Sequence, residues 1–127
     1  MLRLSKIHAD ARGAINSLLG KLGPFPEVAI FETKQGYARG GCIHSASCEH
    51  LCVIVGEIRF FYGDEPKEVW LKPGDSFTIP PMTPHYFIST TDSVVMEWGP
   101  SMAEKQEKHM QFRKIVDAWN ANIVKKV

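Results

Sequence analysis

The sequence has no apolar run long enough to cross a membrane. Its longest uninterrupted run covers residues 51–55, far short of the roughly 20 residues that a membrane-spanning helix needs. The first ten residues carry scattered charges and no long apolar core, which argues against a secretory signal. Only three cysteines are present, and this odd number argues against a disulfide framework. We therefore expect a cytoplasmic protein in a reducing compartment.

An excess of charge of either sign is also missing. The chain carries 15 Lys and Arg against 14 Asp and Glu, and its net charge is +1. No basic run, and no combination of basic stretches with aromatic residues, suggests binding to nucleic acid. The length of 127 residues and the hydrophobic fraction of 44% are typical of one globular domain with a sizeable core.

The middle of the chain consists of short segments rich in β-branched and aromatic residues, separated by Gly and Pro turns. The predicted strands cover residues 28–33, 51–55, 57–62, 69–71, 77–79, 86–88 and 94–98. Gly56 and Glu57 are interpreted as a tight hairpin between the second and third of these. Many short strands with turns at regular spacing indicate an all-β sandwich or barrel.

The two ends of the chain differ from this pattern. Residues 1–26 contain scattered glycines and prolines, and we expect an N-terminal arm that leads into a barrel of residues 27–100. Residues 102–124 lack Gly and Pro and repeat apolar side chains at three- and four-residue steps, which predicts an amphipathic helix with Ser101 as its N-cap. The helical segment 101–127 is expected to pack on the barrel or on a partner subunit.

The first of two spaced motifs resembles a signature of the cupin superfamily. That signature is Gly, five residues, His-x-His, three or four residues, Glu, six residues and Gly. Gly36, Cys42, His44, Glu49 and Gly56 keep this spacing, with a cysteine in place of the first histidine. The resemblance implies a cupin β-barrel, the double-stranded β-helix also called a jelly roll.

The second cupin motif follows downstream. In the superfamily it is Gly, five residues, Pro-x-Gly, two residues, His, three residues and Asn. Gly74, Pro80 and His85 match it, while Met82 stands in place of the second Gly and Ser89 in place of the Asn. Because every spacing is kept, the two motifs together resemble a complete single-domain cupin.

The resemblance implies that Cys42, His44, Glu49 and His85 converge on one divalent metal ion inside the barrel. Cys42 and His44 are two residues apart, so in a strand they face the same side. Two imidazoles, a carboxylate and a thiolate suit a first-row transition metal, and we expect Zn, Fe, Mn or Ni. Cys42 is equally well a fourth ligand or an inert neighbour, since free cysteines are often simply buried.

Such a site would leave coordination positions open for a substrate, as catalytic metals require. The sequence therefore favours an enzyme of the isomerase, lyase or oxygenase type that acts on a small polar substrate, either carbohydrate-like or an organic acid. A non-catalytic cupin that only binds a small ligand is the alternative from a different class. Cupins commonly pair, so the resemblance also implies a homodimer.

A narrower resemblance gives a third reading. Residues 39–44 resemble the Arg-Gly-x-His-x-His element of dTDP-4-keto-6-deoxyglucose 3,4-ketoisomerases. Residues 10–13 resemble an Asp-x-Arg-Gly element of those enzymes and of dTDP-4-dehydrorhamnose 3,5-epimerases. This resemblance implies metal-free chemistry with His44 and His85 as acid and base, for which imidazole has a suitable pKa.

In this reading, arginines and tyrosines near the motifs contact the substrate. Arg39 and Arg12 are candidates for a sugar-nucleotide diphosphate, because guanidinium matches the geometry of phosphate oxygens. Tyr37 and Tyr86 could supply a phenol, although tyrosine on a strand usually serves packing. For Arg12 the plainer interpretation is a surface arginine.

Overall fold

A computed structural model describes residues 3–19, 28–99 and 106–125. The described residues form eleven strands and one helix: β1 (Arg3–Asp10), β2 (Gly13–Leu19), β3 (Val28–Thr33), β4 (Ala38–His44), β5 (Glu49–Val55), β6 (Ile58–Tyr62), β7 (Lys67–Leu71), β8 (Ser76–Ile79), β9 (His85–Ser89), β10 (Ser93–Trp98), β11 (Gln106–Lys108) and α1 (Met110–Lys125). The strands make a six-stranded sheet in the order β1-β2-β3-β10-β5-β8 and a five-stranded sheet in the order β11-β4-β9-β6-β7.

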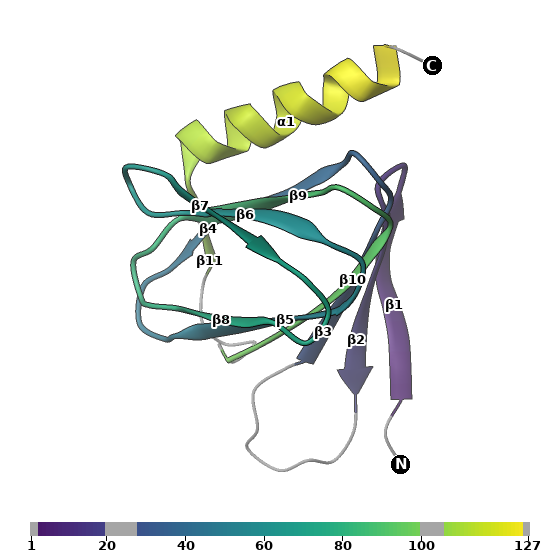
Figure 1. Cartoon of the computed structure of the whole chain (residues 1–127). Coiled ribbons are helices and arrows are strands. Elements are labelled where there is room, and N and C mark those ends of the chain that lie inside the picture. Colours follow the sequence, from purple (N-terminus) through teal and green to yellow (C-terminus); the bar gives the residue numbers. More distant parts are fainter. Residues whose placement is uncertain (1–2, 20–27, 100–105, 126–127) are drawn as a thin grey trace.

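The two antiparallel sheets face each other and close into a cup (Figure 1). Side chains alternate along each strand, so that Leu51 and Val53 of β5 are buried while Ile54 is exposed. One apolar face from each sheet therefore meets in a shared core, made of Leu51, Val53, Ile58, Phe60, Leu71, Ile79, Phe87 and Val95. The predicted all-β jelly roll of two antiparallel sheets is confirmed.

The predicted hairpin at Gly56 is wrong, because the strands on its two sides belong to different sheets. β5 pairs with β8 and β10, whereas β6 pairs with β7 and β9. Gly56 still turns the chain, with a positive φ of 80°. The turn is held instead by the loop before β10: Thr91 Oγ1 accepts from Glu57 N at 3.0 Å, and Thr90 N donates to the Glu57 carbonyl at 3.0 Å.

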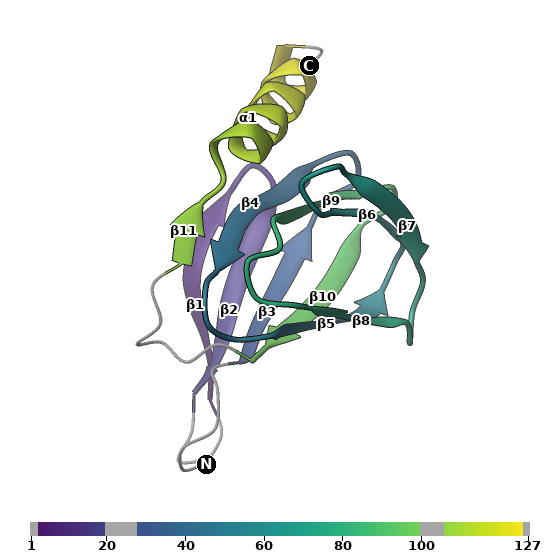
Figure 2. The same ribbon diagram turned by 90° about the vertical axis from the view of Figure 1, so that its left-hand side faces the viewer.

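Within the predicted N-terminal arm, the described residues form part of the six-stranded sheet. β1 and β2 pair as a hairpin, and β2 continues the sheet by pairing with β3 (Figure 2). The turn of the hairpin is fixed by Arg12, whose Nη2 donates to Asp10 Oδ2 at 2.7 Å. Residues 20–27, where the arm was expected to end, lie outside the described residues. The hairpin thus adds a wall to the open side of the cup.

Helix α1 begins later than predicted. Ser101 and Met102 lie outside the described residues, and residues 106–108 form β11 along the edge of β4 rather than helix. The predicted apolar stripe is nevertheless present, because Phe112 and Val116 are fully buried against the outer face of the five-stranded sheet. The helix lies across β4 and β9 of its own chain (Figure 1). No helix in the described part of the chain is both long and apolar enough to span a bilayer.

A bulge in β4 orients the residues that follow it. Gly40 pairs with Tyr86 and Cys42 pairs with His85, so Gly41 is an extra residue between two cross-strand pairs. Both glycines have positive φ. A Cβ on Gly41 would lie 2.9 Å from the backbone nitrogen of Arg113, because α1 begins directly above the bulge. The bulge therefore needs glycine both for its backbone conformation and for the close approach of α1.

Candidate metal centre

Three side chains from both sheets converge at one end of the core. Glu49 begins β5 and Glu97 lies in β10, both in the six-stranded sheet, while His85 begins β9 in the other sheet. Ligand atoms of these three residues all lie within 4.8 Å of one another. Glu49 and His85 are only 4% and 5% exposed. A histidine and two carboxylates at this spacing form a donor set suited to a divalent transition metal.

The hydrogen bonds of His85 fix which of its nitrogens faces this centre. Nδ1 lies 3.2 Å from the carbonyl oxygen of Thr83. A carbonyl can only accept, so Nδ1 carries a proton and, in the neutral ring, Nε2 presents its lone pair. That nitrogen lies 3.4 Å from Oε1 of Glu49. A lone pair facing a carboxylate needs either a proton or a cation between them, so the residues present fit a metal ion.

The two carboxylates of the centre have opposite pKa shifts. Burial and the negative charge of Glu49 raise the pKa of Glu97 well above its ordinary value, although the residue as a whole keeps some exposure. Burial would also raise the pKa of Glu49, but hydrogen bonding to His85 and its charge outweigh that effect and lower it. In the absence of a cation, the raised pKa of Glu97 favours its protonated form, which can donate a hydrogen bond to the Glu49 carboxylate.

His44 reaches Glu49 but stands outside the group of three. Its Nε2 lies 2.8 Å from Oε2 of Glu49, on the other oxygen from His85. Its ligand atoms do not join the set that lies within 4.8 Å. Nδ1 of His44 is buried and has no hydrogen-bond partner in the described part of the chain. As placed here, His44 positions the Glu49 carboxylate.

Cys42 lies on the wall next to the centre. It faces inward as the cross-strand partner of His85 and is partly buried. Burial raises the pKa of its thiol, so without a metal the sulfur stays protonated at neutral pH. Like His44, Cys42 lies outside the three-residue group. The structure thus brings all four expected ligands to one region, with Glu49 and His85 at its centre.

A cavity of about 320 Å³ opens beside the centre. Its polar wall contains Cys42, Glu49, His85 and Glu97, together with three arginines, and its apolar wall includes Phe31 and Phe87. The hairpin of β1 and β2 closes one side of it through Ile7 and Ile15. This volume accommodates a small organic molecule next to the metal ligands.

The two tyrosines expected at the substrate are not in this cavity wall. Tyr86 points to the opposite face of β9, where its ring stacks on Phe61 with centroids 4.6 Å apart and packs under α1. Tyr37 borders a separate hollow next to α1. His50 faces outward, as strand alternation predicts, with its ring stacked on Trp98. Arg39, by contrast, lines the cavity.

Glu97 is the residue of the centre that the sequence motifs did not indicate. The strand over residues 94–98 was expected, and alternation places Glu97 on the same face as Val95, which is completely buried. A carboxylate on the inward face of a strand is unusual unless it is paired or binds a metal. The alternation of inward and outward side chains in residues 94–98 was therefore the sequence feature that could have indicated Glu97.

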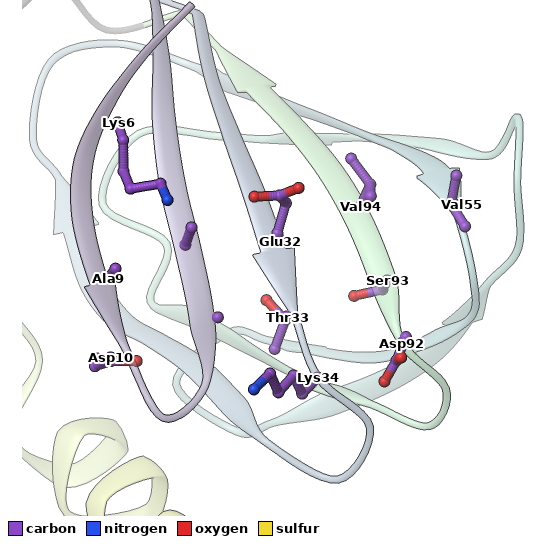
Figure 3. Close-up of a pocket in the computed structure, with 12 residues that line it drawn as sticks. Lys6, Ala9, Asp10, Glu32, Thr33, Lys34, Val55, Asp92, Ser93 and Val94 are labelled. Atoms are coloured by element: carbon purple, nitrogen blue, oxygen red, sulfur yellow. The ribbon is translucent and has the colours of Figure 1, made fainter.

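A second hollow, of about 470 Å³, lies on the outer face of the six-stranded sheet. Figure 3 shows residues that line it, among them Lys6 on β1, Glu32 on β3 and Val94 on β10. Its wall contains no histidine or cysteine. Among the described residues, the group of possible metal ligands that lie within reach of one ion is Glu49, His85 and Glu97, inside the cup.

The family model described as a cupin domain matches residues 30–99. The chain belongs to the cupin family. The matched segment contains both motifs, the cavity wall formed by β4, β5, β9 and β10, and the three converging residues. A search of curated proteins finds no match for this cupin.

Solved structures similar to this cupin come from several proteins. CapF, a capsular polysaccharide assembling protein from Staphylococcus aureus, is 19% identical with a TM-score of 0.71, and the match covers 85% of this chain but 32% of CapF. KdgF from Halomonas sp. is 18% identical with a TM-score of 0.63, over 75% of this chain and 84% of KdgF. Fe(II)-HppE is 23% identical with a TM-score of 0.59, over 76% and 55%. These similarities show the fold, and the chain spans about a third of CapF.

Proposed function

We propose that this cupin binds one divalent transition metal ion at Glu49, His85 and Glu97 and uses it on a small polar substrate in the adjoining cavity. His44 would hold the second oxygen of Glu49, and Cys42 would stand beside the ion as a neighbour or a further ligand. The supporting observation is the His85 ring, whose Nδ1 is committed to the Thr83 carbonyl while Nε2 faces a carboxylate. Fe(II) in the similar structure of HppE agrees with this assignment.

The bound ion would act as a Lewis acid toward a substrate oxygen. Residues of the chain itself would exclude water and orient the metal ligands. The apolar core below the centre and the hairpin beside it would exclude bulk water. His44 would keep Glu49 oriented through the 2.8 Å contact. Isomerase, lyase and oxygenase chemistry all remain open to such a centre.

Elemental analysis of protein purified without a metal-affinity tag tests the proposal. We expect about one equivalent of a transition metal, and H85A should lose it. H50Q is a matched control, because His50 lies on the outer face and stacks on Trp98. Metal-free wild-type protein that retains full activity would refute the proposal.

The metal-free sugar-nucleotide isomerase is a second candidate, supported by one contact. A carboxylate 2.8 Å from a histidine, as at Glu49 and His44, is an arrangement that can orient a general base. Against it, His44 does not line the cavity. Turnover of a dTDP-linked keto sugar in the presence of chelator, lost in H44N, would favour this candidate. No turnover with such sugars would count against it.

A further inference from the structure

Arg39 is a buried arginine whose guanidinium is only partly satisfied. The residue is 3% exposed, and its side chain faces inward as the cross-strand partner of Phe87. Nε donates to Thr33 Oγ1 at 2.8 Å, and Nη2 donates to the Glu32 carbonyl at 3.1 Å. Nη1 is closed off from solvent and has no hydrogen-bond partner among the described residues. An unpartnered donor on a buried charged group is costly, so this nitrogen calls for an acceptor.

The other arginines of the cavity wall are already occupied. Arg12 is paired with Asp10 at 2.7 Å. Arg113 donates to the Gly40 carbonyl at 2.8 Å and contacts Asp117 at 3.2 Å. In the described part of the chain, Arg39 makes no ion pair of this kind. Burial and the charge of Arg12 lower the pKa of Arg39 to about 10, so it keeps its charge at neutral pH.

The geometry points to a carboxylate on the substrate: we propose that the cavity takes a small monoanionic acid whose carboxylate pairs with the guanidinium of Arg39 at the cavity wall, while its other end faces Glu49, His85 and Glu97. This inference rests on the proposed function, for which it names the substrate class. It also distinguishes between the two substrate types left open by the sequence, since a neutral sugar would leave Arg39 unsatisfied.

A carboxylate fits this wall better than a phosphate does. Both anions match a guanidinium. The same cavity, however, already contains the carboxylates of Glu49 and Glu97, and a phosphate that carries two charges would be repelled more strongly than a monoanion.

The test is calorimetry on metal-free protein, kept so by chelator, with three probes of known chemistry. D-glucuronate is the acid, D-glucose is its neutral counterpart and inorganic phosphate is the competing anion. We expect D-glucuronate to bind with a dissociation constant of roughly millimolar order, and D-glucose to show no binding. R39Q should weaken glucuronate binding at least about tenfold, as loss of one charge-assisted hydrogen bond implies.

R59Q is the matched control, because Arg59 is paired with Glu68 at 2.6 Å on the outside of the five-stranded sheet. This substitution should leave glucuronate binding unchanged. If R39Q does not fold, the Arg39 Nε resonance of the wild-type protein gives the same answer by shifting with glucuronate and not with glucose. Equal binding of glucuronate and glucose, phosphate binding tighter than glucuronate binding, or wild-type affinity in R39Q would each overturn the inference.

The metal-free condition separates this inference from the proposed function. Glucuronate binding that depends on Arg39 in the presence of chelator supports the carboxylate subsite even if elemental analysis finds no metal. If the protein binds metal but does not bind D-glucuronate in preference to D-glucose, the carboxylate subsite is refuted and the metal centre is not.

Discussion

At the scale of single residues, Glu97 is expected to make the stability of the metal-free protein depend on pH. Its pKa is raised in the folded protein, so the native state keeps a proton that the unfolded chain releases above its ordinary pKa near 4.5. Stability of metal-free protein should therefore fall as pH rises from about 4.5 toward the folded-state pKa. E97Q removes this loss, and urea denaturation in chelator should find it more stable than wild type at pH 8 and nearly equal at pH 4.

E65Q provides the comparison for that experiment, because it also removes one carboxylate, at an exposed position in the turn before β7. If metal-free wild-type protein is more stable than E97Q at pH 8, the prediction that Glu97 has a raised pKa is wrong. Adding metal should reverse the order of wild type and E97Q, since the ion uses the Glu97 carboxylate.

The residues of the centre were predictable to different degrees. Glu49 and His85 came from the resemblance to the two cupin motifs, whose spacing this sequence keeps. Glu97 lies outside both motifs, and only the pairing of β10 with β5 brings it beside Glu49. Met82 shows a further limit: it stands where the family motif has glycine, yet its backbone keeps a positive φ of 63°. A residue other than glycine can therefore hold the positive φ that glycine adopts most easily.

At the scale of elements, α1 is held to the cup by a paired contact with β4. Asn120 Oδ1 accepts from Ala38 N at 2.8 Å, and Nδ2 donates to the Ala38 carbonyl at 3.0 Å. Ala38 is 1% exposed, so its backbone groups have no access to water. N120A should lower the free energy of unfolding by about 2 kcal/mol, because both groups would lose their partner.

N122A is the control for this contact, since Asn122 is exposed on the same helix and should change stability by less than about 0.5 kcal/mol. Chemical denaturation of both variants measures the difference. Equal stability of N120A and N122A would mean that the paired contact does not hold the helix.

Element boundaries show where local patterns stopped being informative. The strand over residues 28–33 was predicted with the bounds that the structure has, because its β-branched and aromatic residues pack on a sheet wherever the chain places it. The start of α1 and the partners of β5 were missed. Both depend on pairing between segments far apart in sequence, β11 with β4 and β5 with β10. A turn residue such as Gly56 indicates that the chain changes direction, but not which strand the next strand pairs with.

At the scale of the whole molecule, the candidate centre joins the two sheets. Glu49 and Glu97 belong to the six-stranded sheet and His85 to the five-stranded one. Next to these three residues, apolar side chains of both sheets pack in the shared core, and the cavity opens beside the centre. An ion bound at this position would therefore tie the two sheets together beside the cavity.

Metal binding should consequently raise the stability of the entire fold. A ligand that binds only the native state adds about 2.7 kcal/mol when its free concentration is a hundred times the dissociation constant, which for a domain of this size is a rise of about 10 °C in Tm. Calorimetric melting of chelator-treated protein, titrated with Mn²⁺, Ni²⁺ or Zn²⁺, should show Tm climbing with the logarithm of metal concentration. H85A should melt at a constant temperature, whereas H50Q should follow wild type. A wild-type Tm that ignores all three ions would show that the two sheets are joined without a metal.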